Sequence, residues 1–281
     1  MNNNLTINQY LENIRTEYFT GGFTKCWDKW GFTNQIPQYN KIYYIVDGEC
    51  YLKIDDKEYI AKKGQLILLP YNSVQTYYHI SKNHLVKYWL HCTFSCNDKD
   101  LLELISLPHI ITVDNHEYLS YLFKQILLYD GQPNITSKLL QKSYIIQLLA
   151  YYFEKSDSAE KSIFKDEKIS ILMSYIENNF QNDININTLC NVTHFHPNYF
   201  IRFFKKIIGI SPIEYINNVR IEHAKKHLQA LNIPIKNIAF NVGFKNSYYF
   251  SRIFKKKTGF TPSKYRLISN AKHTQEEIDD N

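Results

Sequence analysis

The sequence has no long apolar run. Its longest apolar stretches, residues 66–70 and 145–153, are short, and Gln147 interrupts the second. A membrane-spanning helix needs roughly 18 consecutive apolar residues, so we expect no membrane span. The first ten residues lack a basic stretch followed by an apolar one, which argues against a secretory signal. We therefore expect a cytoplasmic protein with no membrane partner.

Cysteine is scarce and irregularly spaced. The chain has 5 cysteines among 281 residues, an odd number that does not suggest a disulfide framework. Cys92 and Cys96 fall in one predicted strand, and no second pair follows them to complete a zinc site. We expect reduced, mostly buried thiols and no metal site.

Acidic residues are scarce between residues 186 and 272, although 44% hydrophobic and 21% charged residues in the whole chain are typical of a globular protein. Residues 1–162 carry a net charge of −1. Residues 186–272 hold 15 Lys and Arg against only Glu214 and Glu222, which gives a net charge of +13. Such a concentration of positive charge indicates phosphate binding. The alternative is a basic face that contacts only solvent.

Residues 36–95 show the period-two pattern of short β-strands and predict a barrel or sandwich. The stretch 42–70 contains three short strands separated by turn-forming pairs, and 86–94 predicts another strand. The pairs are Asp47-Gly48, Asp55-Asp56 and Lys63-Gly64.

Amphipathic helices follow from residue 115. A first helix, with apolar residues spaced from Leu119 to Leu127, and a second over 136–154 are predicted, separated by a Gly-Gln-Pro-Asn break. These helices pack either on the β-domain or on a second subunit. We expect a first domain over 1–155, a linker over 156–162, a second domain over 163–270 and a tail over 271–281. The predicted helices of the second domain are 165–180, 186–193, 197–208, 212–230, 235–242, 246–258 and 262–268.

The second domain contains an internal repeat. Residues 196–216 and 246–266 align without a gap and are identical at nine of 21 positions. Each copy reads as a short helix, a turn and a longer helix, which is the pattern of a helix-turn-helix. Gly209 and Gly259 are expected to end the longer helices, Pro197 to begin the first of them, and Gly243 to lie in a turn.

The longer helix of each copy has one apolar face and one polar, basic face. Phe200, Phe204, Phe250 and Phe254 are spaced to face inward. A helix that exposes polar residues in its first two turns and lysines near its end suits docking in the major groove. The joining segment 212–229, eighteen residues long, spans roughly 27 Å as a helix, near the ~34 Å of one DNA turn.

The motifs IAFNVGFKNSYYFSRIFKKKTGFTPSKYR (238–266), NTLCNVTHFHPNYFIRFFKKIIGISP and VRIEHAKKHL strongly resemble the AraC/XylS family of bacterial transcription activators. The resemblance implies that both recognition helices enter adjacent major grooves of double-stranded DNA, and it implies RNA polymerase and a second copy of the chain as partners. The candidate base contacts are Asn198, Ile201, Arg202, Ser247, Tyr248, Ser251 and Arg252. The candidate phosphate contacts are Lys205, Lys255 and Lys256. Arg220 is expected to form a structural ion pair, and His194 and His196 to be turn or cap residues.

The β-rich section resembles the cupin-like sensor domain found in this family. Metal-dependent cupins carry histidines after each glycine motif, but here no histidine precedes His79, and Gln75 stands near the second expected position. We expect no metal, no cofactor and no catalytic residue. A small effector, a sugar or a related metabolite, is implied by the resemblance. The candidate ligand contacts are Arg15, Trp27, Trp30, Tyr39, Tyr43, Trp89 and His91, with Tyr44 as a further aromatic side chain.

The expected fold is therefore α+β. It comprises an N-terminal cupin-like β-barrel with two appended helices and a C-terminal all-α domain of two helix-turn-helix units. The hypothesis is a DNA-binding regulator, an activator, that responds to a small ligand. A cupin-type enzyme with an accessory DNA-binding tail, and a constitutive DNA-binding protein whose barrel only dimerises, are the alternatives.

Overall fold

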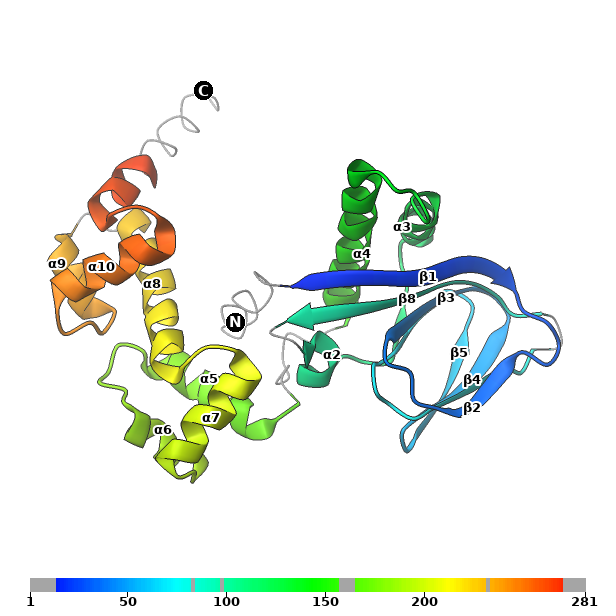
Figure 1. Ribbon diagram of the computed structural model, residues 1–281, viewed down its shortest axis with the longest axis horizontal. Coiled ribbons are helices and arrows are strands. Elements are labelled where there is room, and N and C mark those ends of the chain that lie inside the picture. The colour runs from blue at the N-terminus through cyan, green and yellow to red at the C-terminus, as the bar shows by residue number, and fades with distance from the viewer. Residues whose placement is uncertain (1–13, 82–83, 97–98, 157–164, 231–232, 270–281) are drawn as a thin grey trace. The chain divides into compact units, whose positions relative to one another are not determined.

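The computed structural model describes residues 14–81, 84–96, 99–156, 165–230 and 233–269. Described residues up to 165 form one compact unit, and those from Asp166 form a second (Figure 1). The linker predicted over 156–162, apart from its first residue, and the tail predicted over 271–281 lie outside the described residues. The α+β expectation is confirmed, because the first unit is built on β-sheets and the second is helical.

Two antiparallel sheets form the first unit, and their strands are ordered β1-β8-β3-β6-β10, with β9 beside β8, and β2-β7-β4-β5. The strands are β1 (Arg15–Lys25), β2 (Gly31–Gln35), β3 (Asn40–Asp47), β4 (Glu49–Ile54), β5 (Lys57–Lys62), β6 (Gln65–Leu69), β7 (Gln75–His79), β8 (Val86–Cys96), β9 (Lys99–Asp100) and β10 (Ile110–Thr112). One apolar core lies between the sheets and includes Tyr43, Ile45, Leu52, Ile67 and Tyr77.

The sheet is more extensive than the period-two pattern suggested. The prediction of three strands over 42–70 is wrong: the three turns separate four strands, β3 to β6. Strands β1 and β2 precede residue 36, where the sequence gives no clean alternation because β1 has a bulge between Tyr18 and Thr20. A bulge shifts the period by one residue and hides the strand from a periodicity search.

Among the described residues, the helices that accompany the sheets are α2 (Leu101–Leu104), α3 (His116–Leu128) and α4 (Ile135–Lys155). Asn115 and Asn134 cap α3 and α4 by accepting hydrogen bonds from backbone N–H groups of the first turn. Phe123 of α3 stacks on Tyr88 with ring centres 5.5 Å apart, so α3 packs on the outer face of the larger sheet. Among the described residues, no helix is long and apolar enough to cross a membrane.

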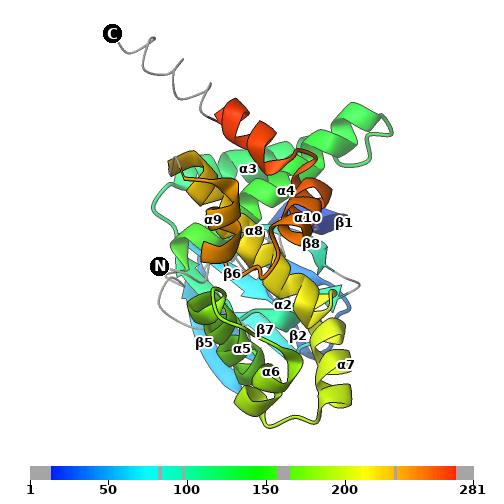
Figure 2. The same ribbon diagram turned by 90° about the vertical axis from the view of Figure 1, so that its left-hand side faces the viewer.

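The second unit consists of helices arranged around one long helix. They are α5 (Glu167–Asn179), α6 (Ile186–Thr193), α7 (Pro197–Ile208), α8 (Pro212–Ala230), α9 (Ile235–Asn241) and α10 (Ser247–Thr258). A further helix occupies residues 262–269. Figure 2 shows α5, α6 and α7 near one end of α8, and α9 and α10 near the other. The helix bounds agree with the sequence prediction to within two residues, because capping residues stand at most of the helix ends.

Candidate nucleic-acid interface and ligand site

Capping residues set the bounds of the two longer helices. His196 and Pro197 begin α7, while the Asn246 side chain accepts hydrogen bonds from the N–H groups of Tyr248 and Tyr249 to begin α10. Gly209 and Gly259 end the helices in the left-handed conformation, with φ of 84° and 78°. A β-carbon is unfavourable there, which explains the glycine in both copies. His194 also adopts this conformation and ends α6, so both histidines are cap residues, as expected.

A pair of phenylalanines anchors each helix to its unit. Phe200 and Phe204 of α7 are buried with ring centres 5.8 Å apart, and Phe250 and Phe254 of α10 repeat the arrangement at 5.6 Å. Tyr215 packs against Phe204 in the first copy. The inward orientation predicted for these rings is confirmed. The opposite face of each helix is left for a partner.

The exposed face of α7 carries the predicted contacts of the first copy. Asn198, Ile201, Arg202 and Lys205 are all exposed. The Nε of Arg202 donates to the backbone oxygen of Asn198 at 3.3 Å, so its guanidinium folds back along the helix. An exposed arginine can leave such a contact at little cost and reach a base edge.

The exposed face of α10 differs in chemistry. Tyr248 is 80% exposed, so it does not pack on the scaffold, and the guanidinium of Arg252 lies 5.4 Å from the centre of the Tyr249 ring. Ser247 and Ser251 are half-buried, and the Ser251 hydroxyl donates to the Ser247 backbone oxygen at 2.9 Å. Lys255 and Lys256 are exposed in the last turn. The two copies therefore share a core and present different surfaces.

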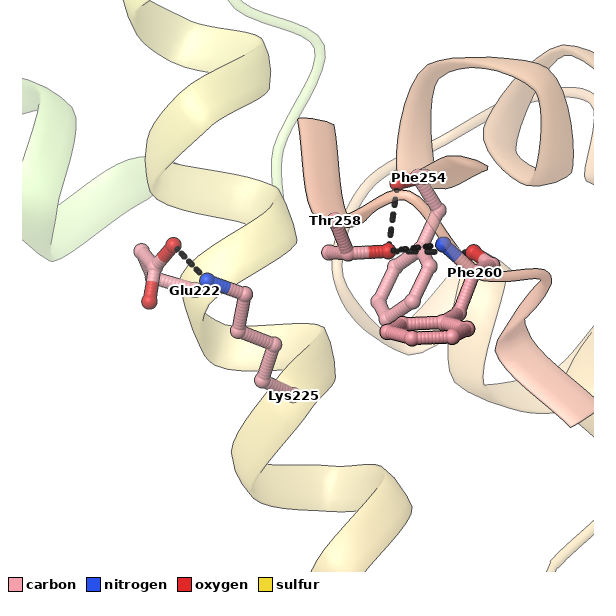
Figure 3. A network of polar contacts seen from close by, with 5 residues as sticks. All are labelled: Glu222, Lys225, Phe254, Thr258 and Phe260. Carbon is pink, nitrogen blue, oxygen red and sulfur yellow. Dashed lines mark hydrogen bonds and ion pairs between the residues drawn. The ribbon is translucent and has the colours of Figure 1, made fainter. Parts of the chain in front are cut away.

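Threonine closes the end of α10. The Thr258 hydroxyl donates to the backbone oxygen of Phe254 at 2.9 Å and accepts from the N–H of Phe260 at 3.2 Å (Figure 3). The figure also shows Glu222 and Lys225 of α8, whose side chains pair at 2.6 Å. The Thr258 contacts join the last turn of α10 to the backbone at Phe260.

Arg220 of α8 links that helix to the segment after α5. Its Nε donates to the backbone oxygen of Phe180 and its guanidinium also donates to that of Asn182, both at 2.8 Å. The role is structural, as predicted, but the expected ion pair is wrong, because the partners are carbonyl groups. Gly243 approaches the same segment: with φ of +90°, a β-carbon there would lie 2.4 Å from the Phe180 backbone oxygen.

Five of the predicted ligand contacts lie together between the sheets. Trp89 and Tyr43 are register partners on β8 and β3, and ring contacts join them to the other three. Trp30 meets Tyr43 at 6.4 Å, and His91 meets Trp89 at 5.0 Å and Tyr39 at 4.6 Å.

Three other candidates lie elsewhere. Arg15 is exposed at the start of β1, and Trp27, after that strand, is 57% exposed. Tyr44 points to the outer face of the sheet, where it stacks on Phe123 of α3, because neighbouring residues in a strand face opposite sides.

Sequence reasoning missed two basic residues of the same interior, Lys41 and Lys87. They are 1% and 4% exposed. Burial lowers the pKa of Lys41 to about 8 and that of Lys87 to about 7. Side chains two residues apart in a strand face the same side. Lys41 lies two residues before Tyr43, and Lys87 two residues before Trp89. This spacing could have indicated that each lysine shares the face of its aromatic neighbour.

His91 completes the basic character of this interior. Burial, together with the neighbouring Lys41 and Lys87, lowers the pKa of His91 to about 4. The imidazole is therefore neutral at pH 7.

All five cysteines are buried. Within the described parts of the chain, no group of three or more His, Cys, Asp or Glu side chains is placed to hold a metal ion.

Two families match the chain. Residues 189–267 match the family described as "Helix-turn-helix domain", and residues 22–149 match "AraC-like ligand binding domain". The two matches fall on the helical unit and the β-sheet unit respectively.

Among similar proteins, the "Bifunctional transcriptional activator/DNA repair enzyme AdaA" of Bacillus subtilis (strain 168) is 41% identical over 108 residues, which cover 38% of this chain and 51% of AdaA. An HTH-type transcriptional regulator of Staphylococcus aureus (strain MSSA476) is 23% identical over 231 residues, 76% of this chain and 30% of that protein. The chain thus spans about half the length of the first relative and under a third of the second.

A solved structure also matches the helical unit. It is the C-terminal domain of AraT, a response regulator from Geobacillus stearothermophilus, with 31% identity and a TM-score of 0.35. The match covers 37% of this chain and 86% of that one.

Proposed function

The chain belongs to the AraC family of helix-turn-helix transcription regulators and carries an AraC-like ligand-binding domain, and we propose that it is a sequence-specific DNA-binding regulator controlled by a small ligand. The observation that carries the proposal is the pair of recognition helices, α7 and α10, anchored by the same aromatic core and exposing basic residues beside polar ones. Basic side chains neutralise phosphates, whereas residues of the first turns read base edges.

The two exposed faces support recognition of two unlike sequence boxes rather than a palindrome. Asn198 and Ile201 on α7 are replaced by Tyr248 and Ser251 on α10, while Arg202 and Arg252 correspond. α8 joins the copies over 19 residues, a length that suits boxes about one helical turn of DNA apart.

Regulation is proposed to be activation through contact with RNA polymerase, in keeping with AdaA, whose name describes a transcriptional activator.

Homodimerisation is proposed through α3 and α4, which leave large apolar side chains exposed. These are Leu128, Ile135, Leu139 and Ile146. The effector is proposed to be a sugar or a related small metabolite, bound among the inward-facing aromatic side chains. No catalytic role is proposed for this chain.

Arg252→Ala is expected to reduce discrimination between the target site and random DNA by about 1–3 kcal/mol, because a base-reading arginine carries sequence information. The measurement is the ratio of dissociation constants for target and random duplexes at one salt concentration. Retention of the full ratio by Arg252→Ala would mean that this face of α10 does not read bases.

Lys255→Ala is the matched comparison one helical turn away. We expect it to weaken binding to target and random DNA alike and to reduce the slope of log K against log salt by about 1. Titrations at several salt concentrations give the slope. A change in discrimination with an unaltered slope would contradict the assignment of Lys255 to phosphate.

A further inference from the structure

Two lysines occupy the interior between the sheets, where a charged group is costly. Lys41 lies on β3 and Lys87 on β8, and these strands pair directly, with Lys41 opposite His91 and Lys87 opposite Ile45. Both side chains are almost entirely buried. Lysine is almost never fully buried unless it is paired.

The groups around the two amines are aromatic or neutral. The Nζ of Lys87 lies 3.3 Å from the centre of the Tyr43 ring and 4.4 Å from that of Trp30. The Nζ of Lys41 donates to the Tyr77 hydroxyl at 2.9 Å and to Gln35 Oε1 at 3.3 Å.

No carboxylate balances these amines within the described residues. The titratable groups that act on Lys87 are the thiols of Cys26 and Cys50 and the amine of Lys41 itself. His91 also faces both lysines. Three basic groups thus converge without an acid, and aromatic rings offset only part of the cost of burying an ammonium group. A bound anion would supply the missing charge.

We propose that the effector of this domain is a small organic carboxylate, whose carboxylate group pairs with the amines of Lys41 and Lys87. The proposal rests on the proposed function, in which this unit binds the effector. Trp30, Tyr43 and Trp89 surround the Lys87 amine, whose Nζ lies 4.4, 3.3 and 5.9 Å from their ring centres. The Trp89 ring is held by donation from Nε1 to Thr24 Oγ1 at 2.9 Å. A phosphate is less well matched, since it presents three strong acceptors to an interior with few donors besides the two amines.

The test compares acids with neutral analogues of nearly the same shape. Full-length protein is titrated at pH 7 with benzoate and benzamide, acetate and acetamide, and glucuronate and glucose, and binding is followed by calorimetry and thermal unfolding. We expect at least one acid to raise the unfolding midpoint by about 5–10 °C at a concentration near 100 times its Kd. We expect its neutral analogue to give no shift.

Variants locate the binding. Lys87→Met and Lys41→Met keep the aliphatic length and remove the charge, and each is expected to weaken binding of the acid at least ~30-fold, as removal of a buried charge partner does. Lys63→Met is the control, because the Lys63 side chain is 73% exposed on the same unit, and it should leave binding unaltered.

The proposal is overturned if no acid binds better than its neutral analogue, or if both interior variants bind the acid as tightly as the unaltered protein does. Discrimination between target and random DNA is measured on the same preparations. If that discrimination persists while the acids fail, the DNA-binding function stands and the carboxylate assignment falls. If the unaltered protein binds target and random DNA equally well, the proposed function as a sequence-specific DNA-binding regulator is overturned instead.

Discussion

Lys87→Met is expected to stabilise the β-sheet unit by about 2–4 kcal/mol at pH 6, although the substitution removes the charge proposed to hold the effector. Burial holds the Lys87 pKa at about 7, against an ordinary value of 10.5. That difference implies a cost of about 5 kcal/mol for the charged amine. Contacts with Tyr43 and Trp30 offset about 1–2 kcal/mol of this cost. Methionine occupies a similar volume without the charge.

The gain depends on pH with a definite sign. Because the folded pKa lies below the unfolded one, the unfolded chain binds more protons between about pH 7 and 10.5, and the stability of the unaltered protein rises with pH across that window. Below pH 7 the amine is charged in both states and the cost is complete. The advantage of Lys87→Met should therefore be largest at pH 6 and vanish near pH 10.5.

The chain provides a selective probe for this measurement. All three tryptophans, at positions 27, 30 and 89, lie in the β-sheet unit, so tryptophan fluorescence during urea unfolding of the full chain reports on that unit. Lys63→Met, at an exposed site, should change stability by less than about 0.5 kcal/mol. A Lys87→Met variant less stable than the unaltered protein at pH 6 would mean that the folded unit already balances this charge.

Gly243→Ala is expected to destabilise the helical unit by more than about 3 kcal/mol. The residue has φ of +90°, and a β-carbon would lie 2.4 Å from the Phe180 backbone oxygen and 2.9 Å from that of Gln181. The backbone conformation alone costs an L-residue about 1–3 kcal/mol. The clash adds to that cost, because its partners are backbone atoms in the segment that Arg220 holds in place.

Gly259→Ala is the matched control, since Gly259 has φ of +78° but no atom within 4 Å of the added carbon. It should cost about 1 kcal/mol, the conformational part alone. Urea unfolding of the full chain, followed by the helical circular dichroism signal, compares the two. Equal losses would show that the close approach of Gly243 to Phe180 is relieved by a shift of the segment.

The helical unit was predictable because its signals are local. Proline at 197, asparagine at 246 and glycines at 209 and 259 mark helix ends within a few residues, and the repeat shows each signal twice. The β-sheet unit was predicted less completely. Its core joins strands from distant parts of the chain, so the facing of Lys41 and Lys87 toward one interior depends on a pairing of β3 with β8 that no local window contains.

The partners of Arg220 illustrate the same limit. Its position on an apolar stripe indicated a structural role, but backbone carbonyl groups of Phe180 and Asn182 leave no residue-type signal in a sequence. A prediction that considers only charged side chains as partners therefore assigns an arginine an ion pair even where backbone carbonyl groups bind it. The exposure of Tyr248, in contrast, followed from helical spacing alone.

The stiff connection made by α8 has a consequence for affinity. A helix of 19 residues, held near its middle by Arg220, does not let α7 and α10 move independently as a flexible linker would. Once one of these two helices is bound to its DNA box, binding of the other is intramolecular and occurs at a high effective concentration, provided that the spacing of the boxes fits. A poorly matched second box would still be occupied beside a good first one, whereas a well-matched box at the wrong distance would gain nothing.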